Sequence, residues 1–190
     1  MNNLIVIGVI ALVTVGLTYN TYASLIKKKN KVKEAFSAID TQLKKRYDLI
    51  PNILTIAQKF MEHERGLMED LTKLRTEALK LSNEFSDINK KMELDSLIQS
   101  KLGQFFVSVE NYPQLKSDQT MVTAMQTYNE VEEHISAARR FYNSAVLELN
   151  NAVEIFPSSL FAAIMGITKQ GFFEAENKER KPINASDYLK

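Results

Sequence analysis

Charged and imidazole side chains interrupt otherwise apolar helical patterns at a few positions, and these residues are the ones whose types could do chemistry. Three of them are carboxylates that we expect at a common height, about 20 Å from one end of their helices at 1.5 Å per residue. Carboxylates and histidines gathered at one level of a helical bundle are the usual ligands of bundle metal sites. The carboxylates are Glu64, Asp95 and Glu132, the histidines near that level are His63 and His134, and Arg139 lies about two turns beyond Glu132.

The spacing of these residues favours a structural role over a metal site. Bundle sites place a glutamate three positions before each histidine, but Phe60 and Val131 occupy those positions here. An arginine can satisfy carboxylates by bidentate pairing. We therefore expect a buried ionic layer that fixes helix register, with partner binding and metal binding left open as alternatives. The expected layer consists of Glu64, Asp95, Glu132 and Arg139.

Composition opposes the common kinds of catalysis. The chain has 190 residues and no cysteine, which removes thiol catalysis and zinc–thiolate sites. Its glycines are isolated, so the pattern of a phosphate-binding loop is missing, and its two histidines fall on long helices without a nucleophile elbow. A net charge of +1 also opposes nucleic-acid binding on bulk charge. We expect no enzyme, no catalytic residue, no cofactor and no nucleic-acid partner.

The elements that must position these side chains are helices. Apolar residues recur at alternating spacings of three and four, and prolines occur only at 51, 113, 157 and 182. We predict one helix that continues through the N-terminal region to about Asp48, and a second that begins at Pro51, which suits a first turn. A third follows a loop with capping residues at 81–87 and ends near Pro113. A fourth begins near Ser117 or Asp118 and ends near Phe156. Short connections imply antiparallel neighbours.

The N-terminal segment has the character of a membrane anchor. Residues 4–26 contain no charge, and a helix of that length reaches about 35 Å, enough to cross a hydrocarbon core of about 30 Å. A cleaved signal peptide is the competing interpretation, but it needs positive charge before its apolar core. All the nearby positive charge follows the segment instead. We expect contact with the lipid surface through Lys27, Lys28, Lys29, Lys31 and Lys33.

The predicted fold is all-α, with an N-terminal transmembrane helix followed by an antiparallel up-and-down four-helix bundle. The anchor covers 1–26, and the bundle covers 27–156 with its first helix continuous with the anchor. An apolar segment at 157–176 returns towards the lipid, where it either caps the bundle end or lies in the membrane interface. A polar tail covers 177–190. Contact with a partner or the membrane is expected from Arg140, Tyr142, Asn143, Phe161, Phe172 and Phe173.

Several sequence blocks resemble those of the bacterial LemA family. The most distinctive runs from Asp40 to Asn52, with the letters DTQLKKRYDLIPN, and further blocks occur in the same order at 63–64, 110–116, 137–146, 156–157 and 172–175. Phe36 stands where many relatives carry tryptophan, and Asn150 where tyrosine is usual. The resemblance implies an N-terminal anchor and a cytoplasmic helical bundle, without an established reaction, cofactor or catalytic residue.

These observations predict a membrane-anchored scaffold that self-assembles and organises or shapes the bacterial cell envelope. The alternative is an adaptor or regulator of an integral-membrane partner such as a membrane metalloprotease, and a metal-dependent enzyme is a distant third. The expected partners are the lipid bilayer, further copies of the chain and another integral-membrane protein. Because basic residues next to a span stay in the cytoplasm, we expect a single-pass protein of the inner membrane with its N-terminus outside and its bulk cytoplasmic.

Overall fold

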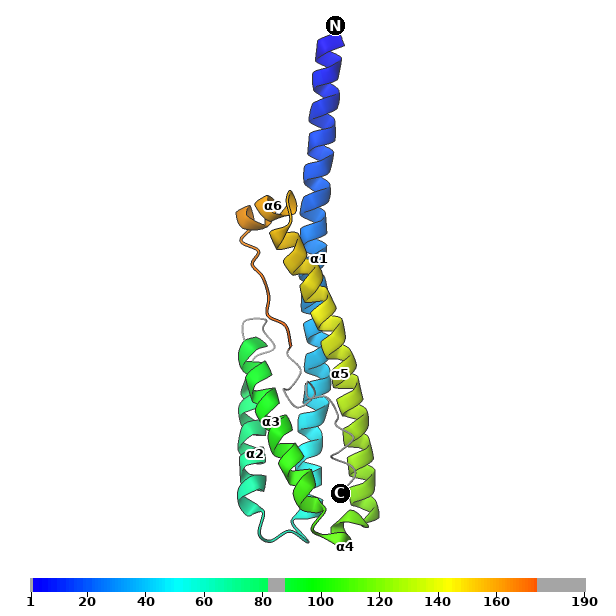
Figure 1. Ribbon diagram of the computed structural model, residues 1–190, viewed down its shortest axis with the longest axis vertical. Helices are drawn as coiled ribbons and strands as arrows, with labels where there is room; N and C mark the ends of the chain where they lie inside the picture. The colour runs from blue at the N-terminus through cyan, green and yellow to red at the C-terminus, as the bar shows by residue number, and fades with distance from the viewer. Residues whose placement is uncertain (1, 82–87, 174–190) are drawn as a thin grey trace, which may run out of the picture. The chain divides into compact units, whose positions relative to one another are not determined.

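The computed structural model describes residues 2–81 and 88–173, and every regular element in these ranges is a helix. This confirms the predicted all-α class and its long apolar N-terminal helix. The polar tail at 177–190 and all but the first residue of the predicted capping loop at 81–87 lie outside the described residues. The helices are α1 (Asn2–Ala57), α2 (Arg65–Lys80), α3 (Ile88–Val109), α4 (Pro113–Lys116), α5 (Gln119–Glu154) and α6 (Ser158–Ile164) (Figure 1).

The chain divides into two compact units. The first comprises Met1–Gln42 and His134–Phe172, and the second comprises Leu43–Glu133 and Phe173–Lys190. Each unit therefore takes a part of α1 and a part of α5. An up-and-down four-helix bundle built from 27–156 as a whole stays a prediction.

In the first unit, the N-terminal part of α1 has no protein neighbours that cover it. Its large apolar side chains from Ile5 to Leu17 are between 52% and 76% exposed. Tyr19 and Tyr22 follow them and are also exposed. By length and composition, α1 carries one candidate membrane span, and the apolar window that qualifies it has none of its residues buried.

Further along α1, the same unit forms a packed helix pair. Val32, Ile39 and Tyr142 have no measurable exposure. The α1 side of this core also contains Ala35 and Phe36, and the α5 side contains Ile135, Ala145, Val146 and Leu149. Next to this core, a hydrogen bond of 2.8 Å from Lys31 Nζ of α1 to Glu148 Oε1 of α5 joins the two helices. Apolar burial, with this pair beside it, holds α5 against α1.

A short chain reversal positions α6 in the first unit. The N–H of Ile167 donates to the carbonyl of Ala162, and that of Gly166 donates to Ala163. Gly166 has φ +63°, which favours glycine at the residue after a helix end. These are the two bonds of a Schellman motif, with Ile167 and Ala162 buried together as its apolar contact. The motif ends α6 after two turns and turns the chain back.

The segment after α6 is held by side chains of α5. The amide of Asn150 donates to the carbonyl of Gln170 and accepts from its N–H, both at 2.9 Å. The Tyr142 hydroxyl donates to the carbonyl of Gly171 at 3.1 Å. Asn150 thus satisfies both backbone groups of one residue in a segment without regular structure.

In the second unit, parts of five helices supply the buried side chains, and the short α4 contributes Leu115. Asp70 of α2 and Lys101 of α3 form an ion pair of 2.8 Å, and they lie at similar distances from the connection between these helices, so α2 and α3 run antiparallel. Figure 1 shows these two helices side by side. The principal buried residues are Leu43, Ile50 and Ile53 of α1, Leu71 of α2, Ile98, Leu102 and Phe105 of α3, and Met121 of α5.

The predicted boundary at Pro51 is wrong, because α1 continues through this proline to Ala57. Proline lacks the N–H that would bond to the carbonyl four residues earlier, which belongs to Tyr47. In the structure, Arg75 Nε of α2 donates to that carbonyl at 2.7 Å. A neighbouring helix therefore satisfies the group that Pro51 leaves, and α1 does not need to end there. The predicted second helix from Pro51 to Leu81 is replaced by the end of α1, a break and α2.

The start of α5 agrees with the sequence prediction. Asp118 Oδ1 accepts from the backbone N–H groups of Thr120 and Met121, at 2.9 and 3.1 Å. This satisfies two of the first N–H groups of a helix, which have no intrahelical partners. The cap thus fixes where the helix that carries Glu132 begins.

Candidate functional site

A buried arginine is the centre of the charged residues in the second unit. The Arg46 side chain has no exposure, and one of its terminal nitrogens lies 2.8 Å from Glu132 Oε1. Its other terminal nitrogen pairs with Asp95 Oδ1, whose side chain is 1% exposed. Arg46 belongs to α1, Asp95 to α3 and Glu132 to α5. One guanidinium thus connects three helices of this unit, which is the geometry of a structural charge cluster.

Aromatic side chains enclose the cluster on the α5 side. Tyr128 lies one turn before Glu132 and is 8% exposed. Its burial, together with the negative charge of Glu132, raises the pKa of the Tyr128 hydroxyl. The ring of Phe106 lies against that of Tyr128, with 4.9 Å between the centroids. At neutral pH the phenol is therefore un-ionised and adds no charge to the cluster.

Sequence analysis did not single out Arg46 as a member of the charged layer. A signal was available, because Phe36, Ile39, Leu43, Arg46, Ile50 and Ile53 follow the three–four alternation, and all six are buried. The predicted layer consisted of Glu64, Asp95, Glu132 and Arg139 and did not include Arg46. Arg46 provides the positive charge beside Asp95 and Glu132 that was assigned to Arg139.

The structure places the other predicted polar residues elsewhere. Glu64 is the N-cap residue of α2 and accepts a hydrogen bond of 2.7 Å from the Tyr112 hydroxyl, which raises the pKa of Tyr112. His63 and His134 are exposed. Arg139 is a half-buried residue of the first unit. Among residues 2–81 and 88–173, the structure brings no three histidine or acidic side chains into an arrangement that could hold a metal ion.

The five lysines expected at the lipid surface, Lys27, Lys28, Lys29, Lys31 and Lys33, form a lysine collar in the first unit. This collar begins where the exposed apolar part of α1 ends. Lys27, Lys29 and Lys33 are exposed, and Lys28 is half-buried. Lys31 is engaged by Glu148, and this hydrogen bond lowers the pKa of the Glu148 carboxyl. The other four lysines thus follow the uncharged segment without donating a hydrogen bond to any carboxylate among the described residues.

The residues predicted to contact a partner or the membrane divide into buried and exposed groups. Tyr142 and Phe173 are buried, Phe161 and Asn143 are half-buried, and Arg140 is exposed. Phe172 is 44% exposed. The larger exposed apolar side chains near them are Ile155, Phe156, Leu160 and Ile164, between 58% and 78% exposed. Ile155 and Phe156 lie in the turn between α5 and α6, and Leu160 and Ile164 belong to α6; none of the four is among the contact residues predicted from the sequence.

The fold and these surfaces define an all-helical, membrane-associated protein with one candidate N-terminal anchor. The chain belongs to the LemA family, whose model matches residues 35–186. It is 24% identical over 180 residues to Protein LemA of Metamycoplasma hominis, which covers 93% of this chain and 81% of that protein. It is also 21% identical over 201 residues to the magnetosome proteins MamQ 1 and MamQ 2 of Paramagnetospirillum magneticum, covering 94% of this chain and 73% of theirs.

Proposed function

We propose that this protein is a non-enzymatic scaffold that self-assembles at the bacterial inner membrane and organises or shapes the cell envelope. The observation that carries the proposal is the unbroken exposed apolar surface of α1 from Ile5 to Leu17, followed by lysines from Lys27 onwards. An uncovered apolar surface of this extent is stable in lipid and costly in water. The lysines favour an orientation with the N-terminus outside and the remaining chain in the cytoplasm.

A structural role is supported by the buried charges. Arg46 is paired with Asp95 and Glu132, so the cluster holds helices together in an arrangement that needs no substrate. The names of the relatives describe no reaction, and two of them are magnetosome proteins.

Self-assembly is supported by apolar side chains that the first unit leaves uncovered on α5. Phe141 is 45% and Leu147 is 52% exposed. In α1, a Cβ atom built on Gly8 or Gly16 meets no atom within 4 Å, so both positions are open to the approach of another helix. The same exposed residues also support the second candidate function, an adaptor that binds an integral-membrane protein.

The mass of the full-length protein distinguishes the two candidates. Light scattering in mild detergent and in lipid nanodiscs, corrected for detergent and lipid, should give a discrete multimer if the protein is a scaffold. Replacing Phe141 and Leu147 by serine should lower that mass. The matched control is Val107→Ser, which removes an apolar side chain that is 70% exposed in the second unit. A monomer in both media contradicts the scaffold and favours the adaptor.

A further inference from the structure

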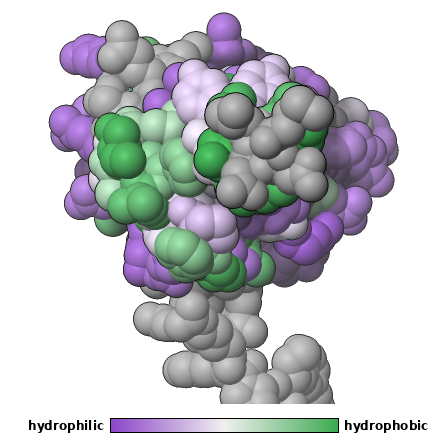
Figure 2. All heavy atoms as spheres, turned by 90° about the horizontal axis from the view of Figure 1, so that it is seen from above, coloured by the Kyte–Doolittle hydropathy of each residue, from purple (hydrophilic) through white to green (hydrophobic). Residues whose placement is uncertain are grey.

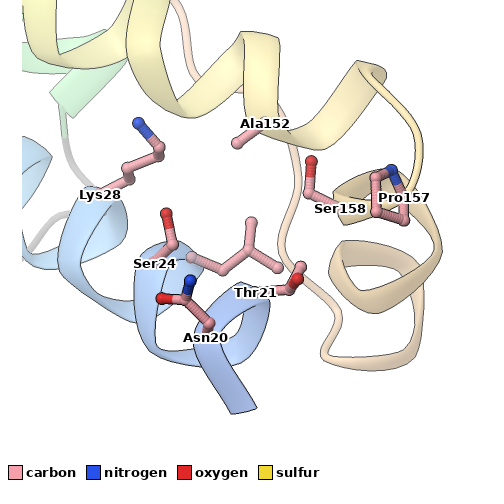
Figure 3. Close-up of a pocket in the computed structure, with 8 residues that line it drawn as sticks. Asn20, Thr21, Ser24, Lys28, Ala152, Pro157 and Ser158 are labelled. Carbon is pink, nitrogen blue, oxygen red and sulfur yellow. The ribbon is translucent and has the colours of Figure 1, made fainter. Parts of the chain in front are cut away.

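A polar cavity opens in the first unit where α1, the end of α5 and the start of α6 meet. Its volume is about 270 Å³. This is just below the range of about 300–1,000 Å³ in which pockets enclose drug-sized ligands, so it can take a small polar group but not a whole lipid. It is lined by Asn20, Thr21, Ser24, Leu25 and Lys28 from α1, Ala152 from α5, the N-cap residue Pro157 and Ser158 of α6. Figure 3 labels all of these residues except Leu25.

Three hydrogen-bond donors of α1 face the cavity in one row. Asn20, Ser24 and Lys28 are four residues apart, so they lie on the same side of the helix. In Figure 3 the Ser24 hydroxyl and the Lys28 ammonium extend from adjacent turns. The hydroxyls of Thr21 and Ser158 already donate to the backbone carbonyls of Leu17 and Ile155. The row on α1 therefore supplies the donors that a ligand can use.

The cavity favours a negative charge. The eight residues that line it include one lysine and no carboxylate. The Lys28 ammonium lies 4.0 Å from Glu148 Oε2, which is beyond hydrogen-bond distance. Glu148 accepts its short bond from Lys31 instead, at 2.8 Å. The Lys28 ammonium can therefore donate into the cavity without giving up a hydrogen bond to Glu148.

The position of the cavity along α1 identifies the source of the anion. The exposed apolar side chains of α1 end at Tyr22, and the lysines begin at Lys27, so residues 20–28 lie at the expected boundary between hydrocarbon and water. The α6 wall is continuous with exposed Phe156, Leu160 and Ile164. Viewed along α1 from its N-terminal end, Figure 2 shows hydrophobic residues gathered beside that helix. Phosphate groups of lipids already lie at this depth.

We propose that this cavity binds the phosphate-containing headgroup of an anionic phospholipid, while the apolar side chains of α6 insert among the adjoining acyl chains. Asn20, Ser24 and Lys28 donate to the phosphate, and Leu25, which is 1% exposed, forms the apolar floor. This inference rests on the membrane anchoring in the proposed function. It adds a specific lipid site to the diffuse attraction of the lysine collar.

The test compares two lysines that carry the same charge. Full-length protein in mild detergent is titrated with phosphatidylglycerol or phosphatidylcholine, and native mass spectrometry counts the retained lipids. We expect one phosphatidylglycerol to be retained preferentially, and Lys28→Gln to weaken its retention about tenfold, as expected for loss of a charge-assisted hydrogen bond. The matched control, Lys29→Gln, removes an exposed lysine that does not line the cavity. It should leave retention unchanged, whereas Ser24→Ala should weaken it without changing the charge.

The result that overturns the inference is equal lipid retention by the Lys28 and Lys29 variants, or equal retention of the two lipids by the unmodified protein. Displacement of phosphatidylglycerol by millimolar inorganic phosphate would overturn the assignment to a lipid and leave a simple anion site. Flotation with vesicles of phosphatidylcholine, compared with vesicles that also contain phosphatidylglycerol, tests the anchor separately. Protein that floats without lipid preference refutes the headgroup site alone, whereas protein that fails to float with either lipid refutes the anchoring itself.

Discussion

In the second unit a guanidinium is fully enclosed and bound to two carboxylates, whereas in the first unit the large apolar side chains of α1 and α6 face outwards. The second unit therefore encloses a charge cluster, in which each charge needs its partner. The first unit leaves apolar area that no part of the unit covers. From this difference we expect the second unit to be stabilised from within and the first unit to be completed by an external apolar phase.

The largest effect should follow removal of the buried positive charge. Arg46→Met removes the guanidinium that pairs with buried Asp95, and we expect a loss of about 3–5 kcal/mol in the free energy of unfolding. Urea titration of the full-length protein in detergent, followed by circular dichroism, measures it. Arg140→Met is the control, because this exposed arginine in the first unit should change stability by less than about 0.5 kcal/mol. Equal stability of the two variants would remove the contrast between the units.

A smaller effect should follow loss of the contact that allows α1 to pass through Pro51. Arg75→Met leaves the Tyr47 carbonyl without its 2.7 Å donor, and we expect a cost of about 1–3 kcal/mol. In a Pro51→Ala background, the new backbone N–H can bond to the same carbonyl. A double-mutant cycle measured by urea titration should therefore show that the arginine matters less in that background. Full additivity would contradict this account of the continuous helix.

In the first unit, disruption of the return segment should be a local effect. Asn150→Ala removes both hydrogen bonds to Gln170, each contributing about 1 kcal/mol. We expect faster amide hydrogen exchange at residues 167–171, with little change in the second unit. Asn150→Asp keeps the acceptor and loses the donor, so it should give an intermediate effect. Unchanged exchange at Gln170 in the alanine variant would show that Asn150 does not hold this segment.

The smallest effect concerns the exposed ion pair beside the lysine collar. Lys31 lowers the pKa of Glu148 in the folded protein, so the pair stabilises the fold above the carboxyl's unfolded pKa. This contribution is lost as the pH falls through the lower folded pKa. Because both side chains are partly exposed, we expect at most about 0.5 kcal/mol. The stability difference between the unmodified protein and Lys31→Met should therefore shrink from pH 7 to pH 3, and a growing difference would reverse the sign.

Apolar spacing and helix-capping residues are sufficient to predict much of the helical structure of this protein from its sequence. The apolar spacing predicted α3 and most of α5, and Asp118 was recognised as a cap. The course of α1 past Pro51 could not be predicted locally, because it depends on Arg75 from another helix. Arg46 was missed for a different reason: its spacing along α1 is that of a core residue, but arginine is rarely buried, so its charge favoured an exposed position. The cavity depends on the turn between α5 and α6, which places Pro157 and Ser158 beside α1 and which no periodicity reveals.

The contrast between the units can be measured directly, because a chain without cysteine accepts single cysteines for spin labelling. Nitroxides attached through Leu12→Cys, Leu160→Cys and Val107→Cys sample α1, α6 and the second unit, all at exposed apolar positions. In lipid nanodiscs, collision rates with oxygen and with a water-soluble nickel complex report the depth of each label. We expect the labels at 12 and 160 to collide more often with oxygen than with the nickel complex, and the label at 107 to collide more often with the nickel complex. If the label at 160 behaves like the one at 107, the surface of α6 lies in water, and the membrane does not complete the first unit there.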